Sequence, residues 1–223
     1  MNINEVMQEL QNMGTEQNRK IYKRHGAGDN QFGVSFANFK LLKKKIKLDH
    51  DLAIQLWETE NTDARIFSTM IIDHTRIEEE TIDTWIKEID YYGLLDQFIY
   101  NVVAKSQYAD KKLKQWLNSE DEWIGRGAWD IVIHKAMNDK DIEDDYFEEL
   151  LIKIKENIHQ SKNRKKESMN NALITIGLRN EALEKKAIEV AEVIGKVQID
   201  HGDTSCKTPS AVEYINKAKK RKN

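Results

Sequence analysis

The chain has 223 residues, of which 39% are hydrophobic and 33% are charged, and its formal net charge is −3 at pH 7. This composition excludes a disordered chain, and the absence of any run of about 18 apolar residues excludes a membrane-spanning helix. The N-terminal stretch MNINEVMQEL lacks the hydrophobic core of a signal peptide. The single cysteine, Cys206, excludes an internal disulfide and fits a reducing compartment, so we expect a cytoplasmic protein without membrane contacts.

The sequence predicts an all-α protein, because Leu, Ile, Lys and Glu recur with apolar spacing near 3.6 and Pro209 is the only proline. The first clearly marked helix covers residues 35–46. Ser35 is its N-cap candidate, and the helix carries an apolar stripe of Phe36, Phe39, Leu42 and Ile46. Lysines, among them Lys40 and Lys44, form a second stripe, which is basic.

The remainder of the chain is predicted to form consecutive helix pairs. The pairs are 50–60 with 61–72, 78–89 with 91–105, 109–118 with 121–137, 146–158 with 165–177, and 182–195 with 209–220. A tight turn near 60–61 joins the first pair. For the last helix we expect Thr208 at the N-cap and Pro209 at the first helical position, which proline tolerates best.

The second helices of these pairs recur at intervals of about 30 to 45 residues, the range of HEAT and armadillo repeats. Such pairs stack into a curved solenoid because no single pair can bury its own apolar face. The sequence therefore predicts one HEAT-like helical-repeat solenoid over residues 1–223, with the second helices on its concave side.

Polar residues interrupt the second helices about one or two turns after each helix begins. They are Arg65, Asp96, Arg126 and the neighbouring Asn170 and Asn171. In a stacked array these side chains would fall in adjacent rows on the concave surface. Two interpretations of Asp96 and Arg126 are open: a structural ladder that ties repeats together, or a site that performs chemistry.

Two glycines, Gly125 and Gly127, flank Arg126 and weaken the start of its helix. Small residues there indicate a close approach by a neighbouring helix or by a ligand. Farther along, Arg164 and Lys165 lead into a second helix near its positive dipole end. Basic residues at these rims are either a solvated face or contacts to a phosphate backbone.

The segment DHGDTSCKTP brings His201, Asp203 and Cys206 close in sequence, but their spacing matches no standard zinc pattern. We expect no metal and no cofactor. The segment is predicted to be an ordered loop that docks the last helix, in which Gly202 makes a turn and Asp203 or Thr204 bonds the backbone.

The sequence resembles the DNA alkylation repair glycosylases of the AlkD type from about residue 32 onward. The resemblance lies in FGVSFANFKLLKKKI, LWETENTDARIFSTMIID, the pair Tyr92 and Asp96, WIGRGAW and IGKVQIDHGDTSCKTPSAVEYI, in that order. It implies a HEAT-like solenoid that grips duplex DNA. It also implies hydrolysis of the N-glycosidic bond of cationic N3- and N7-alkylated purines without a base-flipping pocket.

The resemblance further implies the roles of individual residues. Asp96 matches the family carboxylate that stabilises an oxocarbenium-like sugar and positions water. Arg126 matches the arginine that holds the DNA backbone near the lesion. Tyr92 stands where the family usually has a tryptophan against the lesion sugar, and Asn171 falls where a second tryptophan is usual.

We therefore predict a cofactor-free DNA glycosylase with Asp96, Arg126 and Tyr92 in its site, acting as a monomer in the cytoplasm and at the nucleoid when bound to DNA. The predicted DNA contacts are Arg65, Lys40, Lys44, Lys105, Arg164, Lys165 and Asn171. The alternative is a non-catalytic HEAT-repeat module that binds DNA or a protein partner on the same surface, which the change at Asn171 favours.

Overall fold

The computed structural model describes residues 1–222, which form helices joined by loops, with one isolated bridge between Gly14 and Val34. The chain divides into two compact units. The first comprises Met1–Ala109 together with Gly202–Thr204, and the second comprises Asp110–His201 and the segment from Ser205 onward. Within residues 1–222, no helix is both long and apolar enough to cross a membrane.

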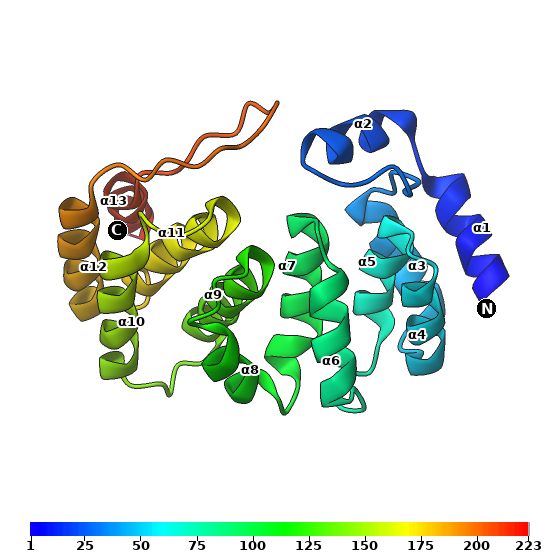
Figure 1. Cartoon of the computed structure of the whole chain (residues 1–223), viewed down its shortest axis with the longest axis horizontal. Coiled ribbons are helices and arrows are strands. Elements are labelled where there is room, and N and C mark those ends of the chain that lie inside the picture. The colour runs from blue at the N-terminus through cyan, green and yellow to red at the C-terminus, as the bar shows by residue number, and fades with distance from the viewer. Residues whose placement is uncertain (223) are drawn as a thin grey trace. The chain divides into compact units, whose positions relative to one another are not determined.

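In the first unit the helices follow the predicted pairs and are preceded by two short N-terminal helices. They are α1 (Ile3–Met13), α2 (Glu16–Arg24), α3 (Phe36–Ile46), α4 (His50–Glu58), α5 (Thr62–Ile71), α6 (Glu79–Trp85) and α7 (Tyr92–Asn101), with 3-10 turns η1 (Ile86–Glu88) and η2 (Val103–Lys105). Helix α5 packs against α3, α4 and α7 and so forms the centre of the unit (Figure 1).

The second unit repeats this plan. Its helices are α8 (Ala109–Trp116), which begins at the boundary, α9 (Glu122–Asn138), α10 (Asp144–Asn157), α11 (Asn163–Gly177), α12 (Glu181–Ile194) and α13 (Ala211–Lys222). Helix α11 packs against α9 and α13, while α10 packs against α12, as Figure 1 shows. The second helices of successive pairs therefore contact one another, which is the packing expected of stacked repeats.

Side-chain caps define where the helices begin. Ser35 accepts a hydrogen bond from the Asn38 amide at the start of α3, as predicted, and Asp121 caps α9 in the same way. The predicted turn near residue 60 is present, with Glu60 at φ 57° between α4 and α5.

A buried carboxylate fastens the segment before α3 onto α5. Asp63 accepts hydrogen bonds from the backbone amides of Phe32, Gly33 and Val34 at 2.6, 3.0 and 2.8 Å. Burial raises the pKa of Asp63, against the lowering effect of these bonds. Gly33 has φ +78°, and a β-carbon there would lie 2.5 Å from the Thr15 carbonyl oxygen, so the close approach requires glycine.

The core of the first unit is built on stacked aromatic rings. Trp57 and Trp85 stack with centroids 3.9 Å apart and an interplanar angle of 2°, and Phe98 packs beside both. On the predicted stripe of α3, Phe39 is fully buried whereas Phe36 is 42% exposed. The rings tie α4, α6 and α7 together across two successive helix pairs.

The last helix begins later than predicted. Helix α13 starts at Ala211, and the Ser210 hydroxyl accepts a hydrogen bond from the Glu213 amide. The predicted N-cap at Thr208 is wrong because the Thr208 hydroxyl hydrogen-bonds His201 instead, at 3.0 Å. Pro209 lies before the helix, and its carbonyl accepts a hydrogen bond from the Asn170 amide at 3.1 Å.

Candidate nucleic-acid interface

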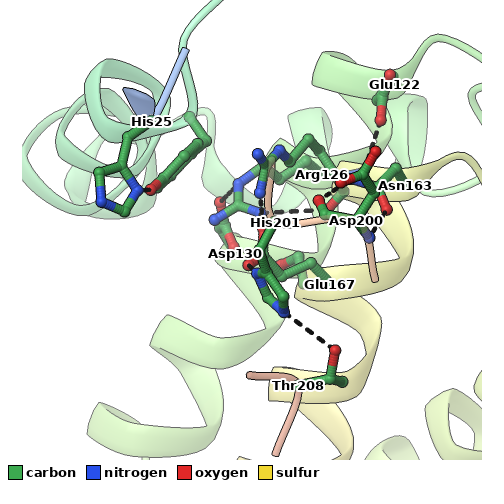
Figure 2. Close-up of polar contacts among 12 residues, drawn as sticks. His25, Glu122, Arg126, Asp130, Asn163, Glu167, Asp200, His201 and Thr208 are labelled. Atoms are coloured by element: carbon green, nitrogen blue, oxygen red, sulfur yellow. Dashed lines mark hydrogen bonds and ion pairs between the residues drawn. The ribbon is translucent and has the colours of Figure 1, made fainter. Parts of the chain in front are cut away.

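Helix α7 presents Tyr92 and Asp96 on one face, because residues four apart in a helix lie one turn from each other. Both side chains are half-buried. The Tyr92 hydroxyl hydrogen-bonds Nδ1 of His25 at 2.5 Å, and the two rings meet edge to face (Figure 2). His25 lies in the turn that follows α2, 67 residues from Tyr92, and no motif marks it in the sequence.

Arg126 is buried at the start of α9 and binds carboxylates. Its guanidinium donates to Glu167 at 2.8 Å and to the Arg164 carbonyl at 3.2 Å, and lies 3.6 Å from Asp130 one turn along α9 (Figure 2). The Arg126 side chain is 5% exposed. Asp130 also accepts a hydrogen bond from Ser168 of α11. In this arrangement Arg126 fastens α9 to α11 through Glu167 and the Arg164 carbonyl.

The N-terminus of α11 is held by neighbouring groups on both sides. Glu122 accepts a hydrogen bond from the Arg164 amide at 2.6 Å, and Arg164 itself contacts Glu167 at 3.1 Å. The Lys165 ammonium donates to the Ser119 carbonyl at 2.8 Å, and burial lowers its pKa.

Gly125 permits this approach, since a β-carbon there would lie 2.6 Å from Cδ of Lys165. The close approach predicted at this glycine is therefore made by a side chain of a neighbouring helix.

Arg65 has a similar role in the first unit. Its guanidinium donates to the Trp57 carbonyl at 3.1 Å and to the Glu88 carboxylate at 3.1 Å, and it lies over the Trp57 ring at 5.1 Å. Glu88 also accepts from the Trp57 indole at 2.7 Å. A phosphate contact by Arg65 would compete with these partners.

Three of the predicted DNA contacts are exposed lysines. Lys40 and Lys44 lie on α3, and Lys105 ends η2. Within the part of the chain that the structure describes, none of the three has an ion-pair or hydrogen-bond partner. Their ammonium groups can therefore take a phosphate without losing an existing contact.

Asn171 lies half-buried on α11, at the wall of a cavity of about 830 Å³. The cavity lies within the second unit, between the C-terminal end of α9, the middle of α11 and the start of α13. Other wall residues include Met137, Lys140 and Tyr214. Asn171 is one of the predicted DNA contacts, but the cavity does not follow from the sequence, because its walls come from segments far apart in the chain.

The segment between α12 and α13 makes the predicted turn at Gly202. Gly202 has φ +61°, and the Thr204 amide donates to its carbonyl at 2.8 Å. His201 lies 3.7 Å from Glu167, and Asn163 and Asp200 exchange two hydrogen bonds of 2.8 Å (Figure 2). Cys206 is exposed, and over residues 1–222 no cluster of three or more His, Cys, Asp or Glu side chains could hold a metal ion.

A model of the family described as "DNA alkylation repair enzyme" matches residues 6–215. The chain belongs to this family. It is 31% identical over 220 residues to the uncharacterized protein Lin0241 of Listeria innocua, covering 96% of each chain. It is also 31% identical over 218 residues to the uncharacterized protein Lmo0209 of Listeria monocytogenes, covering 96% of this chain and 95% of that one.

Among solved structures, one match covers all of this chain and 95% of the other, with a TM-score of 0.92 and 32% sequence identity. That structure is described as "a new family of proteins related to the HEAT-like repeat DNA glycosylases with affinity for branched DNA structures". The likeness confirms the predicted all-α, HEAT-like repeat fold. It also confirms the predicted resemblance to the DNA alkylation repair family.

The predicted site residues of this family member lie in both units and have different surroundings in each. In the first unit Tyr92 and Asp96 share one helical face. In the second unit Arg126 and Arg164 converge on one carboxylate, Glu167. Their shared partner had no distinguishing signal in the sequence, because it lies 41 residues from Arg126 within an ordinary charged run.

Proposed function

We propose that this chain is a DNA-binding protein that prefers branched DNA over linear duplex. The observation that carries the proposal is the full-length likeness, at 32% identity and a TM-score of 0.92, to a protein described as having affinity for branched DNA structures. The chain's membership of the DNA alkylation repair family agrees with DNA as the ligand. We propose that it acts as a monomer inside the cell and reaches the nucleoid when bound to DNA.

The exposed lysines support DNA as the ligand. The formal net charge is −3, so any attraction to DNA must come from local groups. Lys40 and Lys44 lie one turn apart on α3, and Lys105 follows α7. We propose these three as phosphate contacts.

Three other cations named as DNA contacts already have partners. To bind a phosphate, Arg65 would have to leave Glu88 and Arg164 would have to leave Glu167. Lys165 would have to leave the Ser119 carbonyl. A cation that gives up an existing partner for a phosphate gains less binding free energy than an exposed lysine that has no partner to lose. We propose that these three cations chiefly hold the helices in place, and that Arg126 does the same at the start of α9.

The lysine contacts can be tested by salt dependence. Fluorescence anisotropy with a labelled four-way junction, measured over a series of salt concentrations, should show affinity that falls steeply with salt. The double variant Lys40→Ala/Lys44→Ala should bind more weakly and should lower the slope of log K against log salt by roughly 2. The matched control is Lys155→Ala/Lys185→Ala, which removes two exposed lysines from α10 and α12. An unchanged slope in the first variant would exclude α3 from the interface.

A second candidate function is excision of cationic alkylated purines from duplex DNA. The pair Tyr92 and Asp96, one turn apart on α7 with both side chains half-buried, favours it. In this reaction the N-glycosidic bond breaks, and its electron pair leaves with the cationic purine, which becomes neutral. Water adds to the sugar C1′ and loses a proton. Asp96 would stabilise the developing sugar cation and orient the water, and Tyr92 would lie against the sugar.

The two functions are separated by a base-release assay. Duplex DNA that carries N7-methylguanine is incubated with the wild type, with Asp96→Asn and with Asp90→Asn, which changes an exposed carboxylate of the preceding turn. Release by the wild type and the control, but not by Asp96→Asn, would establish excision and identify its carboxylate. Absence of release by all three, with salt-sensitive binding intact, would leave DNA binding alone.

A further inference from the structure

The cavity at Asn171 combines exposed apolar side chains with polar ones. We propose that it receives an unpaired nucleotide from the branch point of a bound DNA. This inference rests on the proposed DNA-binding function and adds to it the feature of branched DNA that is recognised. Branch points differ from linear duplex because base stacking is interrupted there, so that a nucleotide at a branch point can be left unpaired and splayed out of the stack.

The cavity is large enough to hold a nucleotide. Its volume is about 830 Å³, within the range of small-molecule sites. Every wall residue belongs to the second unit, and the walls come from α9 and α11, from the loops that follow these two helices, and from Pro209 and the start of α13. Helix α11 packs directly on both α9 and α13, so the site is formed on a packed scaffold.

Exposed apolar side chains border the cavity. Tyr214 of α13 is 52% exposed and Met137 of α9 is 61% exposed. An exposed aromatic ring is the platform on which unpaired bases stack in single-strand binding proteins. A flexible methionine can adapt to either face of a base. The pair therefore supplies a stacking surface that fits purines and pyrimidines alike.

Polar groups at the wall complement the base and its phosphate. The Asn171 side-chain amide offers both donors and an acceptor, and within residues 1–222 it makes no hydrogen bond. An amide of this kind can pair with the edge of a base. Lys140 is exposed just beyond the end of α9 and likewise has no partner in the described chain. Its ammonium group can neutralise the phosphate of the same nucleotide.

The test uses three labelled DNAs: a linear duplex, a fully paired three-way junction, and the same junction with three unpaired nucleotides at its branch point. We expect the wild type to bind the junction with unpaired nucleotides most tightly. Tyr214→Ala should lose roughly tenfold in affinity for that DNA, the range of one base–aromatic stack, and should bind the fully paired junction as the wild type does.

Controls separate stacking from a structural role. Tyr214→Phe keeps the ring and should retain the preference for unpaired nucleotides. Phe36→Ala removes an exposed aromatic side chain of α3, far from the cavity in sequence, and should leave the preference unchanged. Asn171→Ala and Lys140→Ala should each weaken binding of the unpaired junction more than of the paired one.

Two failures have different meanings. If the wild type binds the paired and unpaired junctions equally, or if Tyr214→Ala keeps the wild-type ratio between them, the cavity proposal is overturned while branched-DNA binding stands. If the linear duplex binds as tightly as the paired junction, the proposed preference for branched DNA is overturned. The ratio between unpaired and paired junctions still tests the cavity in that case.

Discussion

Replacement of Arg126 by methionine distinguishes the structural interpretation of this residue from the DNA-contact interpretation. The side chain is 5% exposed, and its guanidinium contacts Glu167, Asp130 and the Arg164 carbonyl. Methionine keeps much of the side-chain volume but removes the charge and every donor. The structural interpretation therefore predicts a loss of folding stability.

The expected loss of folding stability depends on which partners the two carboxylates keep after the substitution. Asp130 is 4% exposed and keeps its hydrogen bond from Ser168, whereas Glu167 is 20% exposed and keeps Arg164 at 3.1 Å. Removal of one partner of a buried ion pair costs about 3–5 kcal/mol. Because both carboxylates keep one partner, we expect the lower end, about 3 kcal/mol.

Urea unfolding followed by circular dichroism measures this difference. The matched control is Arg19→Met, which removes an exposed pair with Glu16 and should change stability by less than about 0.5 kcal/mol. If Arg126→Met is as stable as the control yet loses DNA affinity, the ladder interpretation is refuted and Arg126 contacts DNA directly.

Three further predictions concern stability and metal dependence. Asp63→Asn should lower the free energy of unfolding by about 2–3 kcal/mol, because one amide oxygen cannot accept from all three of the backbone amides that Asp63 binds; a loss below about 0.5 kcal/mol would contradict this. Burial raises the pKa of Tyr146 from 10.0 to about 12, so the folded state holds its proton more tightly and stability should fall between pH 10 and about 12. In urea unfolding, Tyr146→Phe should lose less stability than the wild type over this pH range. Equal losses in the two proteins would contradict the assignment of this pH dependence to Tyr146. Excess EDTA should leave junction binding unchanged in anisotropy, because the proposed contacts are ammonium groups, and a loss of binding would reveal a required metal.

The helical repeat could be predicted from the sequence because its signals are local. Apolar spacing, Ser35 and Asp121 at helix starts, and the turn near Glu60 all lie within a few residues of what they specify. The N-cap of the last helix was predicted too early, at Thr208, because its cap depends on a contact outside the helix. Thr208 bonds His201 seven residues earlier, and Ser210 takes over the cap.

The candidate site could be predicted only in part, because its partners are distant in sequence. Asp96 and Tyr92 follow from helical spacing on one element. The partner of Arg126 lies 41 residues away and the partner of Tyr92 lies 67 residues away, so neither follows from a pattern along the chain. The cavity at Asn171 likewise exists only once α9, α11 and α13 are packed together.

The most direct test of the account compares the affinity of the wild-type protein for a four-way junction and for a linear duplex of the same length and sequence content, at several salt concentrations. We expect tighter binding to the junction at every salt concentration, with affinity for both DNAs falling as salt increases. Equal affinity for the two DNAs would contradict the preference for branched DNA, and the absence of binding to either would contradict a DNA-binding function.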